Sequence, residues 1–148
     1  MNLFSRMASK SMRGQSLVEF ALVAPLFFLL LFGLIDLGRG VFAYNTIQNA
    51  AREAVRVAIV DQNEDVILAE AQQHAIGLGL EDSNVTLSFL QPDTMVTPCN
   101  TPIAISCEVE ILIGYEFTPA TPIIGNLIGS IDMSAASRQP VERSYVSP

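Results

Sequence analysis

The first clear pattern along the chain is an apolar run near the N-terminus. Leu17–Ile35 contains a single charged residue, Glu19. As a helix, this run matches the hydrocarbon thickness of a bilayer, roughly 30 Å. Secretory signals have a shorter apolar region, about 7–15 residues long, followed by a small-residue cleavage site. No convincing site of that kind follows the run. The pattern therefore predicts a retained transmembrane helix over residues 15–36.

A helical pattern continues beyond the apolar run, over residues 37–60. Apolar side chains recur there at steps of three and four, and polar side chains occupy the opposite side. The apolar series is Leu37, Val41, Tyr44, Ile47, Ala51, Ala54 and Ala58. A continuous helix over Leu17–Val60 would be about 66 Å long and would project from the membrane as an amphipathic stalk. Two helices broken near Gly38 and Gly40 are the alternative, and Pro25 predicts a kink in the membrane half.

The pattern changes twice after the stalk. Asp61-Gln62-Asn63 ends the first helix and begins a second, which the apolar positions extend to Leu80, before a turn at residues 81–84.

From Val85 the period of the apolar positions is two, which is typical of strands. A long half-buried strand covers residues 105–117 after a loop at 91–102, and a weaker one begins at Ile131 and is limited by Pro140. Thr118–Gly129 contains two prolines and two glycines and is predicted to be a loop. An α+β fold with a small antiparallel meander follows, with residues 61–148 as the domain.

Charge is distributed unevenly along the chain. Residues 1–14 carry three basic residues and no acid, whereas residues 15–148 carry five arginines and all 15 acidic residues. The positive-inside rule places such an N-terminus in the cytoplasm and the following domain outside it. An acidic outer domain argues against a nucleic-acid partner. An extracytoplasmic location permits a disulfide between Cys99 and Cys107, which is favoured over two unpaired thiols because both fall in one predicted hairpin.

The sequence offers little that resembles an active site. His74 is the only histidine and lies in an Ala/Gln-rich helix, and no Cys/His set has zinc spacing. Glu108 and Glu110 share one strand face, and a solvated surface is favoured there over a catalytic pair. Phosphate loops and nucleophile motifs are missing. The pattern predicts a protein that is not an enzyme and that needs no metal or cofactor.

The start of the apolar run carries a specific arrangement. A basic leader ends at Gly14, Glu19 follows at the fifth position after it, and Phe20 continues the apolar helix. This resembles the type IV prepilin signal, which a prepilin peptidase cuts after the glycine. The resemblance implies a cut between Gly14 and Gln15. The new ammonium group of Gln15 could then pair with Glu19 of a neighbouring subunit and fix the register between helices. The alternative is a glutamate that reaches the cytoplasmic headgroups.

The resemblance becomes narrower when the next segment is included. RGQSLVEFALVAPLFFLLLFGLIDLGR and YNTIQNAAREAVRVA are similar to the TadE-like pseudopilins of tight-adherence (Flp) pilus systems. The matching positions are Gly14, Glu19, Phe20, Pro25, Gly33, Asp36, Gly38, Arg39, Asn49, Ala50, Ala51, Arg52, Glu53 and Arg56. Gln15 differs from the phenylalanine that classical type IV pilins methylate. The family implies a pilin-like fold and an inner-membrane protein whose partners are the prepilin peptidase, other pilins and inner-membrane assembly proteins.

Major Flp pilins are little more than the processed helix, so the added α+β domain argues for a minor pseudopilin in pilus assembly, adhesion and biofilm formation. The alternative is an uncleaved, single-pass binding module. The apolar segment Pro119–Gly129 is a candidate for its contact surface, although a position packed over the sheet is favoured for this segment. Asp36–Arg39 and Glu53–Arg56 have the spacing of i,i+3 pairs. These side chains, with Arg52 and Pro25, are also candidates for contacts between subunits.

Overall fold

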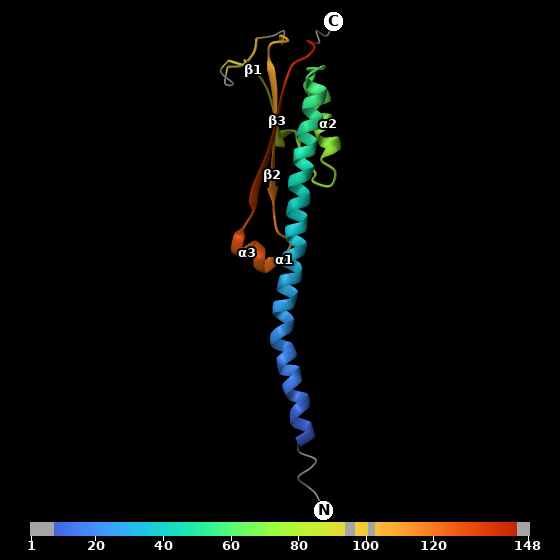
Figure 1. The fold of residues 1–148 in the computed structure, drawn as a ribbon, viewed down its shortest axis with the longest axis vertical. Helices are drawn as coiled ribbons and strands as arrows, with labels where there is room; N and C mark the ends of the chain where they lie inside the picture. The colour runs from blue at the N-terminus through green and yellow to red at the C-terminus, as the bar shows by residue number, and fades with distance from the viewer. Residues whose placement is uncertain (1–7, 94–96, 101–102, 145–148) are drawn as a thin grey trace, which may run out of the picture.

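One long helix and a small domain beside its C-terminal half make up the structure. The computed structural model describes residues 8–93, 97–100 and 103–144. Helix α1 (Ala8–Ala58) has 51 residues and is about 76 Å long. Figure 1 shows its N-terminal half projecting beyond the rest of the molecule, while its C-terminal half lies along the sheet. The predicted α+β architecture is confirmed.

Helix α1 is continuous, which decides between the predicted single helix and the alternative of two helices. It passes through Gly38 and Gly40, so the alternative of two helices is wrong. It also passes through Pro25, and Figure 1 shows a gentle curve in this half of the helix. The helix begins at Ala8, earlier than the expected Leu17, because residues 8–13 contain no proline or glycine and a formed helix propagates readily.

Helix α2 (Glu64–His74) follows directly and packs on α1. The side chain of Asn63 caps it by accepting a hydrogen bond from the Asp65 N–H at 3.0 Å, as the polar triplet predicted. The helix ends at His74 and does not reach Leu80. Gly77 and Gly79 adopt positive φ angles of 81° and 63°, which a helix cannot contain. A short 3₁₀ turn (Asp82–Asn84) then leads into the sheet.

The sheet is a three-stranded antiparallel meander, as predicted. Its strands are β1 (Val85–Leu90), β2 (Glu108–Phe117) and β3 (Ile131–Pro140), in the order β1-β2-β3. The inner face of β2 presents Val109, Ile111 and Ile113, which are fully buried. Glu110 lies on the other face, where it forms an ion pair with Arg138 of β3 at 2.6 Å. Alternation along β2 therefore separates core from surface.

The core lies between the inner face of the sheet and the small side chains of α1. Ile47 and a series of alanines on α1 are fully buried against this face, together with Ile67 and Ala71 of α2. The small residues of α1 let the helix approach the strands closely. The larger side chains of β2 then fill the space between the helix and the sheet.

Ile111→Ala should therefore lower the free energy of unfolding by about 2–5 kcal/mol, because it leaves a cavity in this layer. The measurement is a guanidinium titration of the full chain in detergent, followed by circular dichroism. Leu112→Ala is the matched control, since Leu112 lies next in the strand but is exposed. It should lose about 1 kcal/mol or less. Equal losses at the two positions would contradict the assignment of the inner face.

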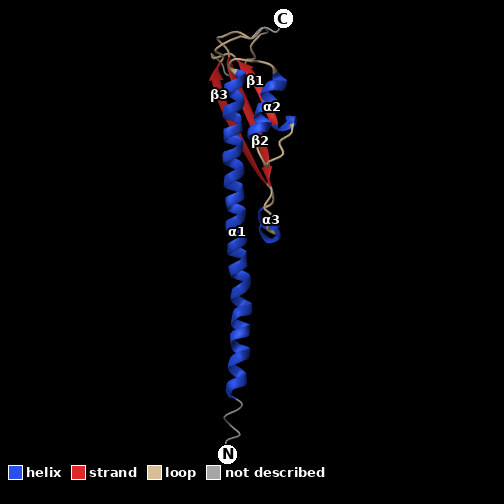
Figure 2. Cartoon of the chain, turned by 90° about the vertical axis from the view of Figure 1, so that its right-hand side faces the viewer, coloured by secondary structure: helices blue, strands red, loops and turns tan. Residues whose placement is uncertain are grey.

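The end of α2 is not the only difference from the prediction for the domain. Residues 122–128, expected to belong to a loop, form helix α3 (Pro122–Ile128). Pro122 occupies the first turn, where a helix needs no N–H from that residue, and Gly129 ends the helix with a φ angle of 78°. Figures 1 and 2 show α3 beyond the end of the sheet and beside α1, whereas the sequence favoured a position over the sheet.

Candidate functional site

Over most of the residues that the structure describes, the N-terminal half of α1 projects away from the domain (Figure 1). Leucine, valine and phenylalanine side chains from Leu17 to Phe32 are exposed on all sides of the helix. α1 contains a segment long and apolar enough to cross a membrane, and none of that segment is buried inside the protein. A helix that is apolar all round requires lipid or other helices around it.

Gln15 and Glu19 lie one turn apart at the start of this segment. Gly14, Gln15, Val18, Glu19 and Leu22 border one shallow hollow on the helix surface. All five residues are exposed, as is Phe20. Among the residues that the structure describes, no ion pair involves Glu19. The carboxylate is thus available to a group outside the folded chain.

Asp36 marks the point where α1 meets the domain. Its side chain is 6% exposed, and both oxygens accept hydrogen bonds. Oδ1 accepts from the backbone N–H of Ala120 at 2.9 Å and from Nη1 of Arg39 at 3.1 Å, and Oδ2 accepts from the N–H of Thr121 at 2.9 Å. The carboxylate therefore accepts hydrogen bonds from the two backbone N–H groups just before α3, and it holds this segment against α1.

Arg39 connects the same point to the end of the sheet. Its guanidinium pairs with Asp36, and its Cζ lies 5.5 Å from the centre of the Phe117 ring, which is within the range of a cation–π contact. The i,i+3 pair that the spacing allowed is thus present. Arg39 contacts Phe117, and its partner Asp36 bonds to residues 120 and 121. These contacts bring together segments that are more than 75 positions apart in the chain.

An apolar groove of about 600 Å³ opens between α1, α3 and the adjacent strand ends. Leu37, Val41 and Tyr44 of α1 form one wall and are largely exposed. They were expected to belong to the buried stripe of the stalk, but within that predicted series burial begins only at Ile47. At Gly33 an added methyl group would lie 3.3 Å from Cδ1 of Ile124, so the absence of a side chain lets α3 approach the helix.

The second predicted pair lies on the outer side of α1. Arg56 Nη1 is 3.8 Å from Glu53 Oε2, and Arg56 and Arg52 are exposed. Exposed pairs of this kind contribute little to stability, about 0–1 kcal/mol. Arg52, Glu53 and Arg56 therefore form a solvated face of the helix at the level of the domain core.

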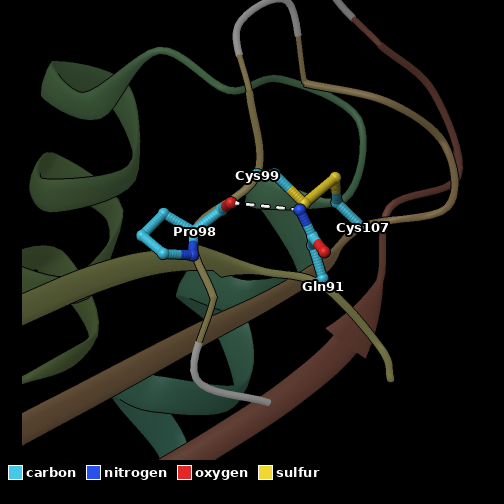
Figure 3. The surroundings of a disulfide bond; sticks show 4 residues. All are labelled: Gln91, Pro98, Cys99 and Cys107. Carbon is cyan, nitrogen blue, oxygen red and sulfur yellow. Dashed lines mark hydrogen bonds between the residues drawn. A yellow bond between two sulfur atoms is a disulfide. The ribbon is translucent and has the colours of Figure 1, made fainter. Parts of the chain in front are cut away.

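Cys99 and Cys107 are joined by a disulfide in the structure, shown in Figure 3. Their Cα atoms are 6.3 Å apart. The bond closes the connection between β1 and β2, which is also held by the Cys99 N–H donating to Phe89 O at 2.9 Å and by Gln91 Nε2 donating to Pro98 O at 3.4 Å. The connection between β1 and β2 lies at the opposite end of the sheet from α3 (Figure 1).

No metal-binding arrangement is found within the part of the chain that the structure describes. His74 is 3.1 Å from Glu70 in the same helix and takes part in a local contact. Sequence reasoning found Asp36 and Arg39 as a pair but missed Ala120, Thr121 and Ile124. The only signal for them was an acid at the edge of an apolar helix, which requires polar partners from elsewhere in the chain.

Comparison with known proteins places this geometry in context. Residues 14–56 match the family described as TadE-like protein. The match covers the exposed apolar segment, Asp36, Arg39 and the part of α1 that packs on the domain. The TadE-like family suggests involvement in Tad pilus systems. No curated protein and no solved structure gives a significant match. Over residues 14–56, this chain is similar to the TadE-like family.

Proposed function

We propose that this chain is a minor pseudopilin that acts in the assembly of a Tad (Flp) pilus. The observation that carries the proposal is the bare apolar segment of α1, which lies within the TadE-like match and has Glu19 exposed near its start. A pilin needs such a helix in order to pack with other subunits after it leaves the bilayer. Roles in adhesion, biofilm formation and related secretion follow from assembly of the pilus.

Processing and orientation belong to the same proposal. A prepilin peptidase would cut between Gly14 and Gln15, and the basic leader would lie in the cytoplasm. α1 would anchor the protein in the bacterial inner membrane, with residues 61–148 outside it. Other pilins, pseudopilins and inner-membrane assembly proteins are the proposed partners. The ammonium group of Gln15 and the carboxylate of Glu19 would pair between subunits.

Processing is tested by intact mass. When the full chain is expressed with its prepilin peptidase, we expect the mass of the mature protein to lack Met1–Gly14. Gly14→Phe should abolish the cut, because a bulky side chain replaces the residue at the cleavage position. Gly38→Phe is a matched control, since Gly38 is exposed and has no atom within 4 Å of an added Cβ. This control should be processed as the unchanged chain is.

An intact leader in the presence of active peptidase would contradict the proposal. That result would instead favour the alternative, an uncleaved single-pass protein whose domain binds a partner. For this alternative, the apolar groove beside α3 is the surface in the structure with the required shape.

A further inference from the structure

The segment from Thr118 to Ser130, here called the α3 tip, has an unusual surface for a domain facing water. It contains no charged residue. Ile123, Leu127 and Ile128 expose 62%, 83% and 58% of their surface, respectively. The nearest charges on either side are Glu116 and Asp132, which face each other across β2 and β3. Exposed apolar side chains gathered in this way mark a contact surface.

The α3 tip lies at the height where α1 leaves the bilayer. If Leu17 marks the cytoplasmic edge of the hydrocarbon, Gly33 is roughly 24 Å and Asp36 roughly 29 Å along the helix, against a hydrocarbon thickness of about 30 Å. Ile124 lies against Gly33, and residues 120 and 121 bond to Asp36. The tip is thus level with the outer boundary of the same membrane.

The backbone of the α3 tip is suited to an environment that contains little water. Asp36 accepts hydrogen bonds from the N–H groups of residues 120 and 121, and within the tip Gly125 N–H bonds to Thr121 O and Gly129 N–H to Gly125 O, each at 2.8 Å. Non-helical backbone is tolerated at membrane depth only where its polar groups are satisfied. Arg39, half exposed beside Asp36, can reach lipid phosphates at this boundary.

We propose that the α3 tip inserts into the outer-leaflet interface of the bilayer that α1 spans. The side chains of Ile123, Leu127 and Ile128 enter the acyl region, while Glu116 and Asp132 limit the depth. This second contact fixes the height and tilt of the domain above the membrane. The occupant is lipid because the exposed surface of the tip continues the apolar surface of α1. The inference rests on α1 spanning a membrane and is independent of pilus assembly.

Single-tryptophan quenching tests the insertion, because the chain contains no tryptophan. The full chain is reconstituted into phosphatidylcholine vesicles in which part of the lipid is brominated, near the headgroup end of an acyl chain in one preparation and near the chain terminus in another. Leu127→Trp reports the tip, Phe27→Trp reports the span of α1, and Asp93→Trp reports an exposed position in the connection between β1 and β2. We expect a blue-shifted emission and loss of fluorescence for the first two variants and neither effect for Asp93→Trp.

The outcomes separate this inference from the anchor on which it rests. Quenching of Phe27→Trp without quenching of Leu127→Trp would overturn the insertion and leave α1 in the bilayer. Absence of quenching at both positions would overturn the span and the insertion together. A blue shift of Leu127→Trp that disappears as the protein-to-lipid ratio falls would identify a second copy as the occupant and overturn the proposal. Unchanged circular dichroism in all three variants controls for folding.

Discussion

Glu19→Ala should strongly reduce piliation while leaving cleavage and membrane insertion intact. The carboxylate lies on a bare helix surface, one turn from Gln15, and the structure describes no ion pair that would require it for folding. Its loss should therefore have no effect on the domain. In the assembled state the same change leaves the Gln15 ammonium group without a partner among apolar helices, which is strongly unfavourable.

We expect the number of pili per cell to fall by about tenfold or more, since removal of one partner from a buried pair costs far more than loss of an exposed one. The number of pili per cell is counted by electron microscopy of cells that express the variant from the native gene locus. Intact mass and membrane fractionation of the same cells show whether processing and insertion persist. Glu19→Gln should behave like Glu19→Ala, because it keeps the size of the side chain and removes only its charge.

Glu53→Ala is the matched control for this experiment. It also removes one carboxylate from α1, but Glu53 pairs loosely with an exposed arginine on the solvated side of the helix. Piliation should remain normal in this variant. Normal piliation in Glu19→Ala as well would discard the pairing between subunits and leave Glu19 as a residue that reaches the cytoplasmic headgroups.

The sequence predicted the elements of this fold better than their contacts. The apolar run, the change of period at Val85 and the alternation along β2 each depend on local spacing, and the structure has the helix and strands that they indicate. α3 was missed because Pro119, Pro122 and two glycines were interpreted as loop signals. Proline in the first turn is compatible with a helix, and sequence alone does not distinguish the two uses.

The face of α1 that packs on the domain shows a second limit. Two neighbouring stripes run along the helix, one with large residues such as Leu37 and Val41, the other with Gly33, Gly40 and Ala43. Periodicity favoured the larger side chains, but the domain lies over the small ones, because they allow Phe117 and Ile124 to approach. The large residues remain as a wall of the groove. Which stripe is covered depends on the shape of the partner surface, and spacing does not encode that shape.

The partners of Asp36 lie 84 and 85 positions away, so no local pattern pointed to them. Asp36→Ala should release the entry to α3. The variant leaves the N–H groups of Ala120 and Thr121 without an acceptor and Arg39 without its ion pair, at a point where little water can replace them. Hydrogen exchange of the full chain in detergent, measured by mass spectrometry, should show faster exchange over residues 118–128 by about tenfold or more, with the sheet unchanged.

Two further variants determine whether the carboxylate itself holds this segment. Asp36→Asn keeps one acceptor oxygen but turns an amide group toward the second backbone donor, so its exchange should lie between those of the unchanged chain and Asp36→Ala. Asp132→Ala removes an exposed acid at the start of β3 and should leave residues 118–128 protected. Unchanged exchange in Asp36→Ala would show that the contact of Ile124 with α1 is sufficient to hold α3. Asp36 would then be only a local partner of Arg39, and the groove between α1 and α3 would depend on apolar packing alone.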